Sequence, residues 1–247
     1  MKSIGIIPSR FASTRFPGKP LIDLLGKSMI QRVYEQAQKA TQLDQVIVAT
    51  DDQRIYDHVK TFDGEVMMTS SDHQTGTSRC AEVASAHTDA TLIVNIQGDE
   101  PIISPQQIDE LIGVSSTGIA TQARRICSDS DLFDSNLVKV VFNQQQKALY
   151  FSRQAIPYGR NHDKNVWLNN HIYYQHIGLY SYDRDTLLDL KNLPESSLEN
   201  MESLEQLRWL DYGIPITVGL TEYESISIDN PEDVSKVLRM LDKKSYL

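Results

Sequence analysis

The sequence predicts an α/β protein with three layers, in which a mostly parallel central sheet lies between two layers of helices. Apolar runs of strand length, rich in β-branched residues, alternate with segments of helical period through the first half of the chain. Two of these runs, residues 46–48 and 92–94, are apolar at every position, as is typical of strands covered on both faces. Such sheets bind ligands beyond the carboxyl ends of their strands, so we expect function in the loops that follow.

The individual elements follow from periodicity and capping signals. In the first half we expect strands at residues 4–8, 45–50, 65–69 and 91–97. Helices are expected at residues 29–37, 53–62, 77–87 and 105–114. In the second half we expect strands at 138–142, 177–182 and 215–220, and one helix over 198–212. A last helix begins after Asn230, with Pro231 at its first position and apolar residues at 234, 237, 238 and 241. The polar, aromatic stretch 158–174 is interpreted as an insertion or a partner-facing hairpin.

Composition excludes several classes of protein. The 247 residues suit one large domain, or one with a modest subdomain, and a composition of 40% hydrophobic and 23% charged residues suits a packed core. A net charge of −9 argues against a general nucleic-acid coat. The two cysteines, Cys80 and Cys127, exclude a disulfide framework or a four-cysteine zinc site and are interpreted as core thiols. The chain has no apolar stretch of the length that spans a bilayer and no signal-peptide pattern at its start, so we expect a soluble protein of a reducing compartment.

The positive charge gathers near the start of the chain. Residues 1–22 contain four cations and no acid, and three of them, Arg10, Arg15 and Lys19, lie in the loop after the first strand. Arginines bind phosphate oxygens bidentately and lysine adds a compact charge, while small residues let the backbone approach a ligand. The small residues of this loop are Ala12, Ser13, Thr14 and Gly18. The loop therefore predicts a nucleoside triphosphate site, with a solvated basic loop as the alternative. It is not a P-loop, because Leu21 stands where that motif needs glycine, and it has no Gly-x-Gly-x-x-Gly.

Two acidic positions are candidate metal ligands. Asp99 follows the strongest central strand in the run Gln-Gly-Asp-Glu-Pro, where carboxylates would face a ligand and suit Mg²⁺. Asp229 stands between a strand-like stretch and the last helix, so it is either a turn or cap residue or a second ligand. Other candidates are weaker: no zinc spacing and no Gly-x-Ser-x-Gly occur. Taken alone, His176 reads as a core histidine, and residues 205–208 read as an exposed polar helix face.

Seven motifs occur in the order of a known family. The run from Arg10 to Leu21 resembles the nucleotide loop of sugar nucleotidyltransferases. The further runs are DHQTGTSR at 72–79, NIQGDEP at 95–101, ALYFSR at 148–153, HIGLY at 176–180, LEQLR at 204–208 and DNPED at 229–233. As an ordered set they resemble the 3-deoxy-manno-octulosonate cytidylyltransferase (CMP-Kdo synthetase) family over nearly the whole chain. Ser9 and Asn230 depart from the family's frequent Ala and Thr, and neither departure removes a charge.

The resemblance implies a nucleotide-diphospho-sugar transferase fold, Rossmann-like, in a cytoplasmic homodimer. It implies Mg²⁺-dependent transfer of CMP from CTP to 3-deoxy-D-manno-octulosonate (Kdo), with release of diphosphate, for lipopolysaccharide biosynthesis. Partners would be CTP and Kdo, with no nucleic acid and no membrane. The single domain 1–247 would comprise a nucleotide-binding part to about residue 125, a sugar-binding and dimerisation part over about 126–225, and a C-terminal helix returning to the core over 226–247.

The resemblance also implies a role for each matching residue. Nucleotide binding would fall to Arg10, Ser13, Thr14, Arg15, Gly18, Lys19, Thr75, Gly76, Arg79 and Gln97. Asp99 and Asp229 would bind Mg²⁺ and act in catalysis together with Arg15 and Lys19. The acidic-sugar pocket would be lined by Arg153, His176, Tyr180, Glu205 and Gln206, with Arg153 paired to the sugar carboxylate.

Two alternatives remain open at this point. The acceptor could be a related acidic sugar, either the 8-amino derivative of Kdo or a sialic acid. The protein could also be a nucleotide-binding module without chemistry, which diphosphate release from CTP and Kdo would exclude.

Overall fold

The computed structural model describes residues 2–12, 16–114, 118–224 and 226–244, with the side chains of 243 and 244 left out. The predicted residues Ser13, Thr14 and Arg15 lie outside the described residues. Among those described, no helix is long and apolar enough to cross a membrane. The C-terminal helix α10 spans Pro231–Lys244, beginning as predicted after Asn230.

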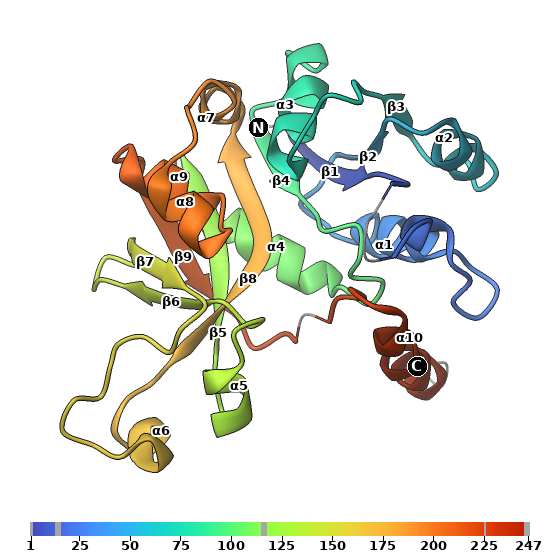
Figure 1. Cartoon of the computed structure of the whole chain (residues 1–247). Coiled ribbons are helices and arrows are strands. Elements are labelled where there is room, and N and C mark those ends of the chain that lie inside the picture. Colours follow the sequence, from blue (N-terminus) through green and yellow to red (C-terminus); the bar gives the residue numbers. More distant parts are fainter. Residues whose placement is uncertain (1, 13–15, 115–117, 225, 245–247) are drawn as a thin grey trace.

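The described strands form one mixed sheet in the order β3-β2-β1-β4-β8-β5-β9 (Figure 1). Their bounds are β1 Ser3–Ser9, β2 Gln45–Thr50, β3 Val66–Met68, β4 Leu92–Asn95, β5 Ile119–Arg125, β8 Tyr174–Asp183 and β9 Ile216–Leu220. Strands β3, β2, β1 and β4 are parallel to one another, and β5 is parallel to β9. The long strand β8 runs antiparallel between β4 and β5, and the hairpin of β6 (Lys139–Phe142) and β7 (Ala148–Ser152) pairs with it through β6.

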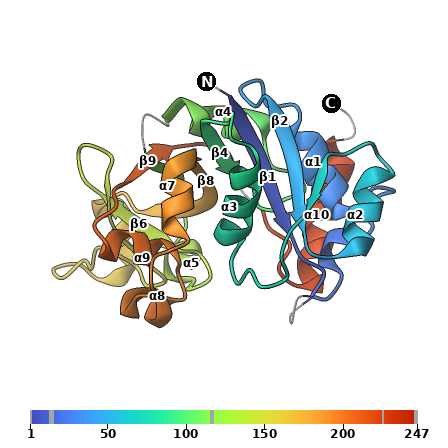
Figure 2. The ribbon, with the colours of Figure 1, turned by 90° about the horizontal axis from the view of Figure 1, so that it is seen from above.

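Helices cover both faces of this sheet, as predicted (Figure 2). Their bounds are α1 Met29–Ala37, α2 Gln53–Lys60, α3 Gly76–Ala86, α4 Pro105–Val114 and α7 Arg184–Leu190. Neighbouring residues of β1 point to opposite faces, because side chains alternate along a strand. Ile6 belongs to the core cluster that includes residues of α3 and α7, whereas Ile7 belongs to the cluster that includes residues of α1 and α4. The parallel half therefore holds the ends of β1 and β4 between two rigid layers.

Strands β5 and β7 and helix α7 were not predicted, and the structure corrects three further interpretations. The single helix expected over 198–212 is two helices, α8 (Ser197–Glu202) and α9 (Gln206–Asp211), because Ser203 adopts the left-handed conformation with φ 53° and ends α8. The segment 158–174 is not a hairpin. It contains a 3₁₀ turn at Lys164–Val166 and the short helix α6 (Trp167–Asn170), and it ends at the start of β8.

The third correction concerns the cysteines. Cys80 is fully buried on α3, and burial raises the pKa of its thiol, so it is the core thiol expected. Cys127 is exposed, so the interpretation of this residue as a core thiol was wrong. It follows β5 directly and precedes the short helix α5 (Asp129–Phe133), at a point where the chain leaves the sheet.

Candidate active site

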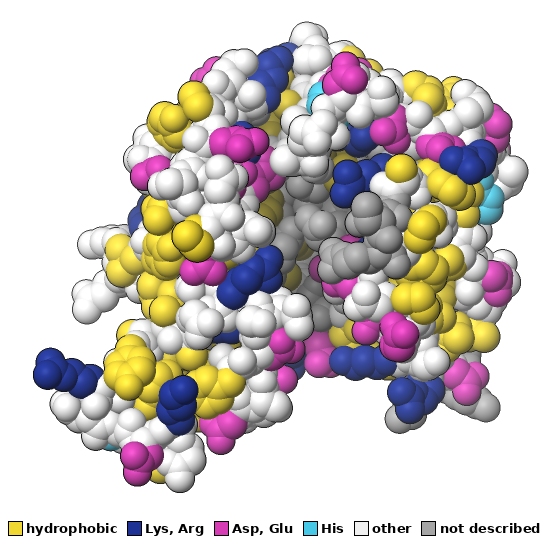
Figure 3. Space-filling view, in the orientation of Figure 1, with side chains coloured by type: hydrophobic (Ala, Val, Ile, Leu, Met, Phe, Trp, Pro, Cys, Tyr) yellow, Lys and Arg dark blue, Asp and Glu magenta, His cyan; other side chains and the backbone are white. Residues whose placement is uncertain are grey.

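A cavity of about 260 Å³ opens at the carboxyl ends of β1 and β4, where the sheet topology places ligands. Four segments line it: the loop after β1, the turn before α3, the loop after β4 and the chain before α10. The lining residues are Pro8, Ser9, Arg10, Lys19, Pro20, Met29, His73, Gln74, Thr75, Gly76, Arg79, Gln97, Gly98, Asp99 and Asp229. In the space-filling view this face is furrowed between the half that carries α1–α3 and the half that carries α8 and α9 (Figure 3).

Two glycines let these segments close on the end of β1. A Cβ atom at Gly98 would lie 3.0 Å from the carbonyl oxygen of Pro8, and one at Gly76 would lie 3.2 Å from the Pro8 ring. A side chain at Gly98 would press on the backbone of β1, and one at Gly76 would require the Pro8 ring to shift. The spacing of the three loops around the cavity therefore depends on glycine at both positions.

The cationic loop is closed on itself around Phe11. The amide of Gly18 donates to the carbonyl of Phe11 at 3.1 Å, and Gly18 has a φ of 71°, which favours glycine. The guanidinium of Arg54 on α2 stacks over the Phe11 ring, 3.4 Å from its centroid. These contacts place Lys19 at the start of a short 3₁₀ turn, Lys19–Leu21, with its side chain directed into the cavity.

Lys19 brings the two predicted metal ligands together. Its Nζ lies 2.8 Å from Asp99 Oδ2 and 3.8 Å from Asp229 Oδ1, and it donates to the carbonyl of Ile228 at 2.8 Å. A backbone hydrogen bond of 2.9 Å from the Ile228 amide to the Asp99 carbonyl ties the two segments directly. The capping contacts before α10 come from Asp233, whose carboxylate accepts the amides of Asp229 and Asn230. The carboxylate of Asp229 thus faces the cavity, although 130 positions separate it from Asp99 in the chain.

The donor set suits Mg²⁺ better than zinc. Two carboxylates converge on one ammonium, so the point between them already holds positive charge. Mg²⁺ commonly takes one or two carboxylates and completes its shell with phosphate oxygens and water. Within the described ranges, no three His, Cys, Asp or Glu side chains gather as a ready-made metal cluster. Asp99 and Asp229 therefore fit a magnesium ion that arrives with a triphosphate.

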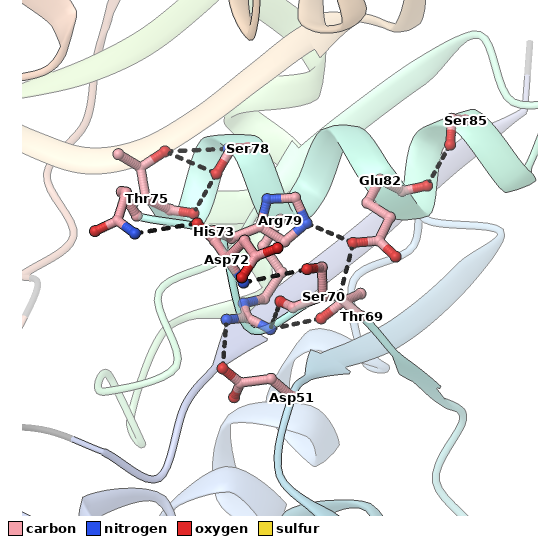
Figure 4. A network of polar contacts seen from close by, with 11 residues as sticks. Asp51, Thr69, Ser70, Asp72, His73, Thr75, Ser78, Arg79, Glu82 and Ser85 are labelled. Carbon is pink, nitrogen blue, oxygen red and sulfur yellow. Dashed lines mark hydrogen bonds and ion pairs between the residues drawn. The ribbon is translucent and has the colours of Figure 1, made fainter.

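The far end of the cavity is a hydrogen-bonded turn before α3 (Figure 4). Thr75 caps α3 by accepting the amide of Ser78 at 3.1 Å. Arg79 is 3% exposed, and its guanidinium donates to Asp51 at 3.0 Å and to Thr69 Oγ1 at 2.5 Å. Glu82 accepts the amide of Ser70 at 2.9 Å and also binds His73. These bonds fix the turn from both sides, so it presents a rigid wall.

Sequence reasoning did not select every lining residue of this cavity. The lining residues that were not selected are Pro8, Ser9, Pro20, Met29, His73, Gln74 and Gly98. His73 and Gln74 lie inside the quoted motif 72–79, so their position next to Thr75 was the available signal.

A second cavity of about 330 Å³ adjoins the first at Gln97, which lines both. Gln97 donates from its side-chain amide to the carbonyl of Gly178 at 2.7 Å, which fixes it between β4 and β8. The other lining residues are Asn136, Leu137, Val138, Gln175, His176, Ile177, Gly178, Tyr180, Leu204, Gln206 and Ser227. Three predicted sugar-pocket residues, His176, Tyr180 and Gln206, are therefore together in one wall.

Burial sets the ionisation of this second wall. Burial lowers the pKa of His176 to about 3, so its imidazole is neutral at neutral pH, and its Nε2 lies 3.1 Å from Thr121 Oγ1. Phe151 and Tyr180 pack against the same ring. Burial also raises the pKa of the Tyr180 hydroxyl well above its ordinary value. The wall consequently offers neutral hydrogen-bonding groups.

The other two predicted sugar residues are not among the side chains that line this cavity. Glu205 accepts a hydrogen bond of 2.7 Å from Thr77 on α3, and burial raises the pKa of its carboxyl. Arg153 donates to the carbonyls of Glu202 at 2.7 Å and of Ser135 at 3.1 Å. Arg153 thus holds the end of α8 against the segment before β6. Of the described residues that line the second cavity, none is lysine or arginine.

The chain matches known proteins over almost its full length. A family model described as cytidylyltransferase matches residues 4–220. Relatives from Parabacteroides distasonis and Bacteroides thetaiotaomicron, both named 3-deoxy-manno-octulosonate cytidylyltransferase, are 52% and 50% identical. The first match covers 98% of each chain, and the second covers 99% of this chain and 100% of the relative.

Solved structures give the same result. A structure described as CMP:2-keto-3-deoxy-manno-octonic acid synthetase complexed with CTP aligns with a TM-score of 0.91 and 39% identity, over 99% of this chain and 100% of that one. A cytidylyltransferase from Leptospira borgpetersenii, at 14% identity and a TM-score of 0.65, shares the fold over 98% of this chain and 87% of its own. The chain therefore belongs to the cytidylyltransferase family, and within it to the 3-deoxy-manno-octulosonate cytidylyltransferases.

Proposed function

We propose that this enzyme transfers CMP from CTP to the anomeric hydroxyl of Kdo, with Mg²⁺, and releases diphosphate. The observation that carries the proposal is the placement of Lys19 between Asp99 and Asp229, in a cavity that adjoins a second one at Gln97. A charged nucleotide and a sugar acceptor each have a cavity of their own, and the two cavities meet where the new bond would form. We further propose that the product serves lipopolysaccharide biosynthesis in the cytoplasm.

In the first cavity the cations bind and orient the triphosphate. Arg10 and Lys19 line the cavity on the side of the cationic loop, where they neutralise the phosphate oxygens and stabilise the diphosphate as it leaves. The roles of Ser13, Thr14 and Arg15 in this loop remain predictions of the resemblance. The rigid turn His73–Gly76 lies across the cavity and, with Arg79 behind it, forms the nucleoside end.

In the second cavity neutral groups bind the sugar. His176, Tyr180 and Gln206 supply hydrogen-bonding groups, and Gln97 stands at the junction. Transfer of a nucleotidyl group asks mainly for positioning and charge neutralisation, so a protein nucleophile is not required. Asp99 and Asp229 would hold Mg²⁺, which would offset the repulsion between triphosphate and sugar carboxylate and favour loss of the hydroxyl proton.

We propose that the enzyme is a homodimer and that its dimer surface lies in the sugar-binding part. An apolar groove of about 810 Å³ lies there between the β6–β7 hairpin and the α6 region. Leu149 and Ile172, which are 60% and 45% exposed, both line this one groove, and apolar side chains gathered in one place are typical of an interface. Light scattering tests this proposal: a dimer is expected, and Leu149→Lys should give monomers. Wild-type protein that remains monomeric at micromolar concentration would contradict it.

The proposed division of the single domain follows the two cavities. The part to about residue 125 carries most of the first cavity, and the part over about 126–225 carries most of the second. Asp229 returns from the C-terminal segment to complete the first cavity.

A diphosphate-release assay tests the proposed function. Wild-type enzyme with CTP and Mg²⁺ should release diphosphate with Kdo, and UTP, ATP and GTP should serve poorly. The 8-amino derivative of Kdo and N-acetylneuraminate are the comparison acceptors. CTP binding without release under any of these conditions would refute the proposal in favour of a binding module.

A further inference from the structure

The second cavity presents a physical problem for an acidic sugar. The acceptor we propose carries a carboxylate, yet none of the described residues lining this cavity is lysine or arginine, and its histidine is neutral. Moving a carboxylate out of water is costly unless positive charge or hydrogen-bond donors replace its hydration. The neutral groups of the lining can replace part of that hydration, but any positive charge must come from outside the described lining side chains.

A fully buried lysine lies directly behind one wall of the cavity. Lys139, the first residue of β6, is 0% exposed, although lysine is almost never fully buried without a partner. Its Nζ donates to the carbonyls of Asp134 at 2.7 Å and Leu137 at 2.5 Å. Within the part of the chain that the structure describes, no carboxylate lies within ion-pair distance of this nitrogen. Burial lowers the pKa of the ammonium, which agrees with incomplete compensation of its charge.

The segment that Lys139 holds is part of the cavity wall. We call residues 134–138 the wall segment, and its members Asn136, Leu137 and Val138 line the cavity. Besides the two carbonyls on Lys139, the carbonyl of Ser135 accepts from Arg153, and that of Val138 accepts from the His176 amide at 2.7 Å. These four carbonyls are therefore turned toward donors, and two cations hold three of them. Carbonyl oxygens in such positions do not face an anion in the cavity.

Two acidic groups lie near Lys139, but the ammonium donates to backbone carbonyls and not to either of them. Glu202 and Asp134 are the acidic groups near it, and Arg153 is the second cation. The Glu202 carboxylate accepts from the Ser152 hydroxyl and the Arg153 amide, and Asp134 accepts from the Asn136 amide. Each carboxylate is thus bonded to groups other than the Lys139 ammonium, which is directed at the wall segment.

We propose that Lys139 is a specificity-determining residue for the acidic sugar. It acts through the wall segment, turning the carbonyls of that segment away from the second cavity and placing positive charge behind a wall whose described residues carry none. This inference rests on the proposed function, because it assumes that the second cavity takes the sugar. It gives Lys139 a positioning role and leaves contact with the sugar to the residues of the lining.

The test compares an acidic with a neutral acceptor. Kdo and its C1 methyl ester differ in charge at the carboxyl group, and Lys139→Met removes the ammonium while keeping a similar length. Replacing a buried ion with an apolar residue of similar volume is often tolerated by a fold. Lys147→Met is the matched control, since Lys147 donates to Thr217 at 2.6 Å and does not line either cavity.

We expect Lys139→Met to raise the KM for Kdo about ten-fold or more and that for the ester less than about three-fold, because only the acid carries a charge that the buried ammonium can favour. The KM for CTP should stay within about two-fold, and Lys147→Met should behave as wild type. Equal increases for both sugars would show a merely structural role and overturn the proposal, as would an unchanged KM for Kdo. If Lys139→Met does not bind CTP, the same comparison of Kdo with its ester is made with Lys139→Gln. Failure of both variants to bind CTP also overturns the proposal.

Failure of the proposed function is distinguishable from failure of this inference. If the wild-type enzyme releases no diphosphate from CTP and Kdo, the function is wrong whatever the variants do. Calorimetric binding of Kdo and its ester to the CTP-bound protein then still tests Lys139, with loss of the preference for the acid in Lys139→Met as the expected result. Wild-type protein without such a preference would contradict the inference.

Discussion

Replacing Lys19 with methionine tests the electrostatics of the first cavity without relying on activity. Because Asp99 Oδ2 and Asp229 Oδ1 lie 2.8 Å and 3.8 Å from the same nitrogen, they are at most about 6.6 Å apart. Two unit charges at that distance repel by about 2.5 kcal/mol at an effective dielectric of about 20, and by about 0.6 kcal/mol in water. This repulsion is present with or without Lys19, and the two ion pairs of the ammonium offset it in the wild-type protein. The two aspartate side chains are 25% and 40% exposed, and pairs of that kind contribute about 0.2–1 kcal/mol each, so we expect Lys19→Met to lower the free energy of unfolding by about 1–2 kcal/mol.

Thermal unfolding with and without Mg²⁺ measures this effect. A loss of about 1–2 kcal/mol corresponds to a decrease in Tm of about 3–6 °C for a domain of this size. Mg²⁺ should restore most of the loss, because a divalent cation can replace the ammonium between the carboxylates, and it should raise the Tm of the variant more than that of wild type. Lys27→Met is the control, since among the described residues Lys27 has one acidic partner, Glu35 at 2.6 Å. A Lys19→Met protein that gains no more from Mg²⁺ than this control would refute the reasoning.

Three further predictions follow from the same geometry. Asp99→Asn and Asp229→Asn should each lose most turnover while CTP binding, measured calorimetrically, is only partly weakened; near-normal turnover in either would refute the metal assignment. Because the pKa of His176 is about 3 in the folded protein and 6.5 ordinarily, the unfolded chain binds a proton that the folded chain excludes. The free energy of unfolding should fall by about 1.4 kcal/mol per pH unit as pH decreases from about 6 toward 4. Denaturant titrations at several pH values should show a weaker pH dependence of this free energy in His176→Gln than in wild type. Gly18→Ala, strained at φ 71° and 3.1 Å from the Phe11 ring, should cost about 1–2 kcal/mol and raise the KM for CTP, and unchanged stability and kinetics would contradict this account of the loop.

The parallel half of the fold could be predicted closely from local pattern. Residues 45–50 and 105–114 are predicted with the same ends as β2 and α4, because strand and helix periods there agree with burial. In the second half, secondary structure could not be predicted where tertiary contacts override the local preference for helix or strand. Strand β5 was missed, since its sequence IATQARR mixes apolar and polar residues, although it pairs with β8 and β9 inside the sheet and five of its seven residues are buried.

The candidate site could be predicted only in part from the sequence. Cations in one loop and an aspartate after a central strand indicate a nucleotide site by composition and topology. The pairing of Asp229 with Asp99 could not be derived from local pattern, because it depends on the chain returning beside β4, through the Ile228 amide, after the second half is complete. The burial of Lys139 could not be predicted for a related reason. It depends on the wall segment that folds over this residue and on the pairing of β6 with β7 and β8.

Binding of Mn²⁺ in place of Mg²⁺, followed by electron paramagnetic resonance, tests most directly whether the two aspartates form one site. In the presence of CTP, the wild-type protein should bind the ion tightly, and Asp99→Asn and Asp229→Asn should each weaken that binding at least about ten-fold, since each removes one of two carboxylate ligands. The double variant, which keeps neither carboxylate, should bind the ion more weakly than either single variant. Full Mn²⁺ affinity in Asp229→Asn would contradict the account, because the two halves of the chain would then not share a metal.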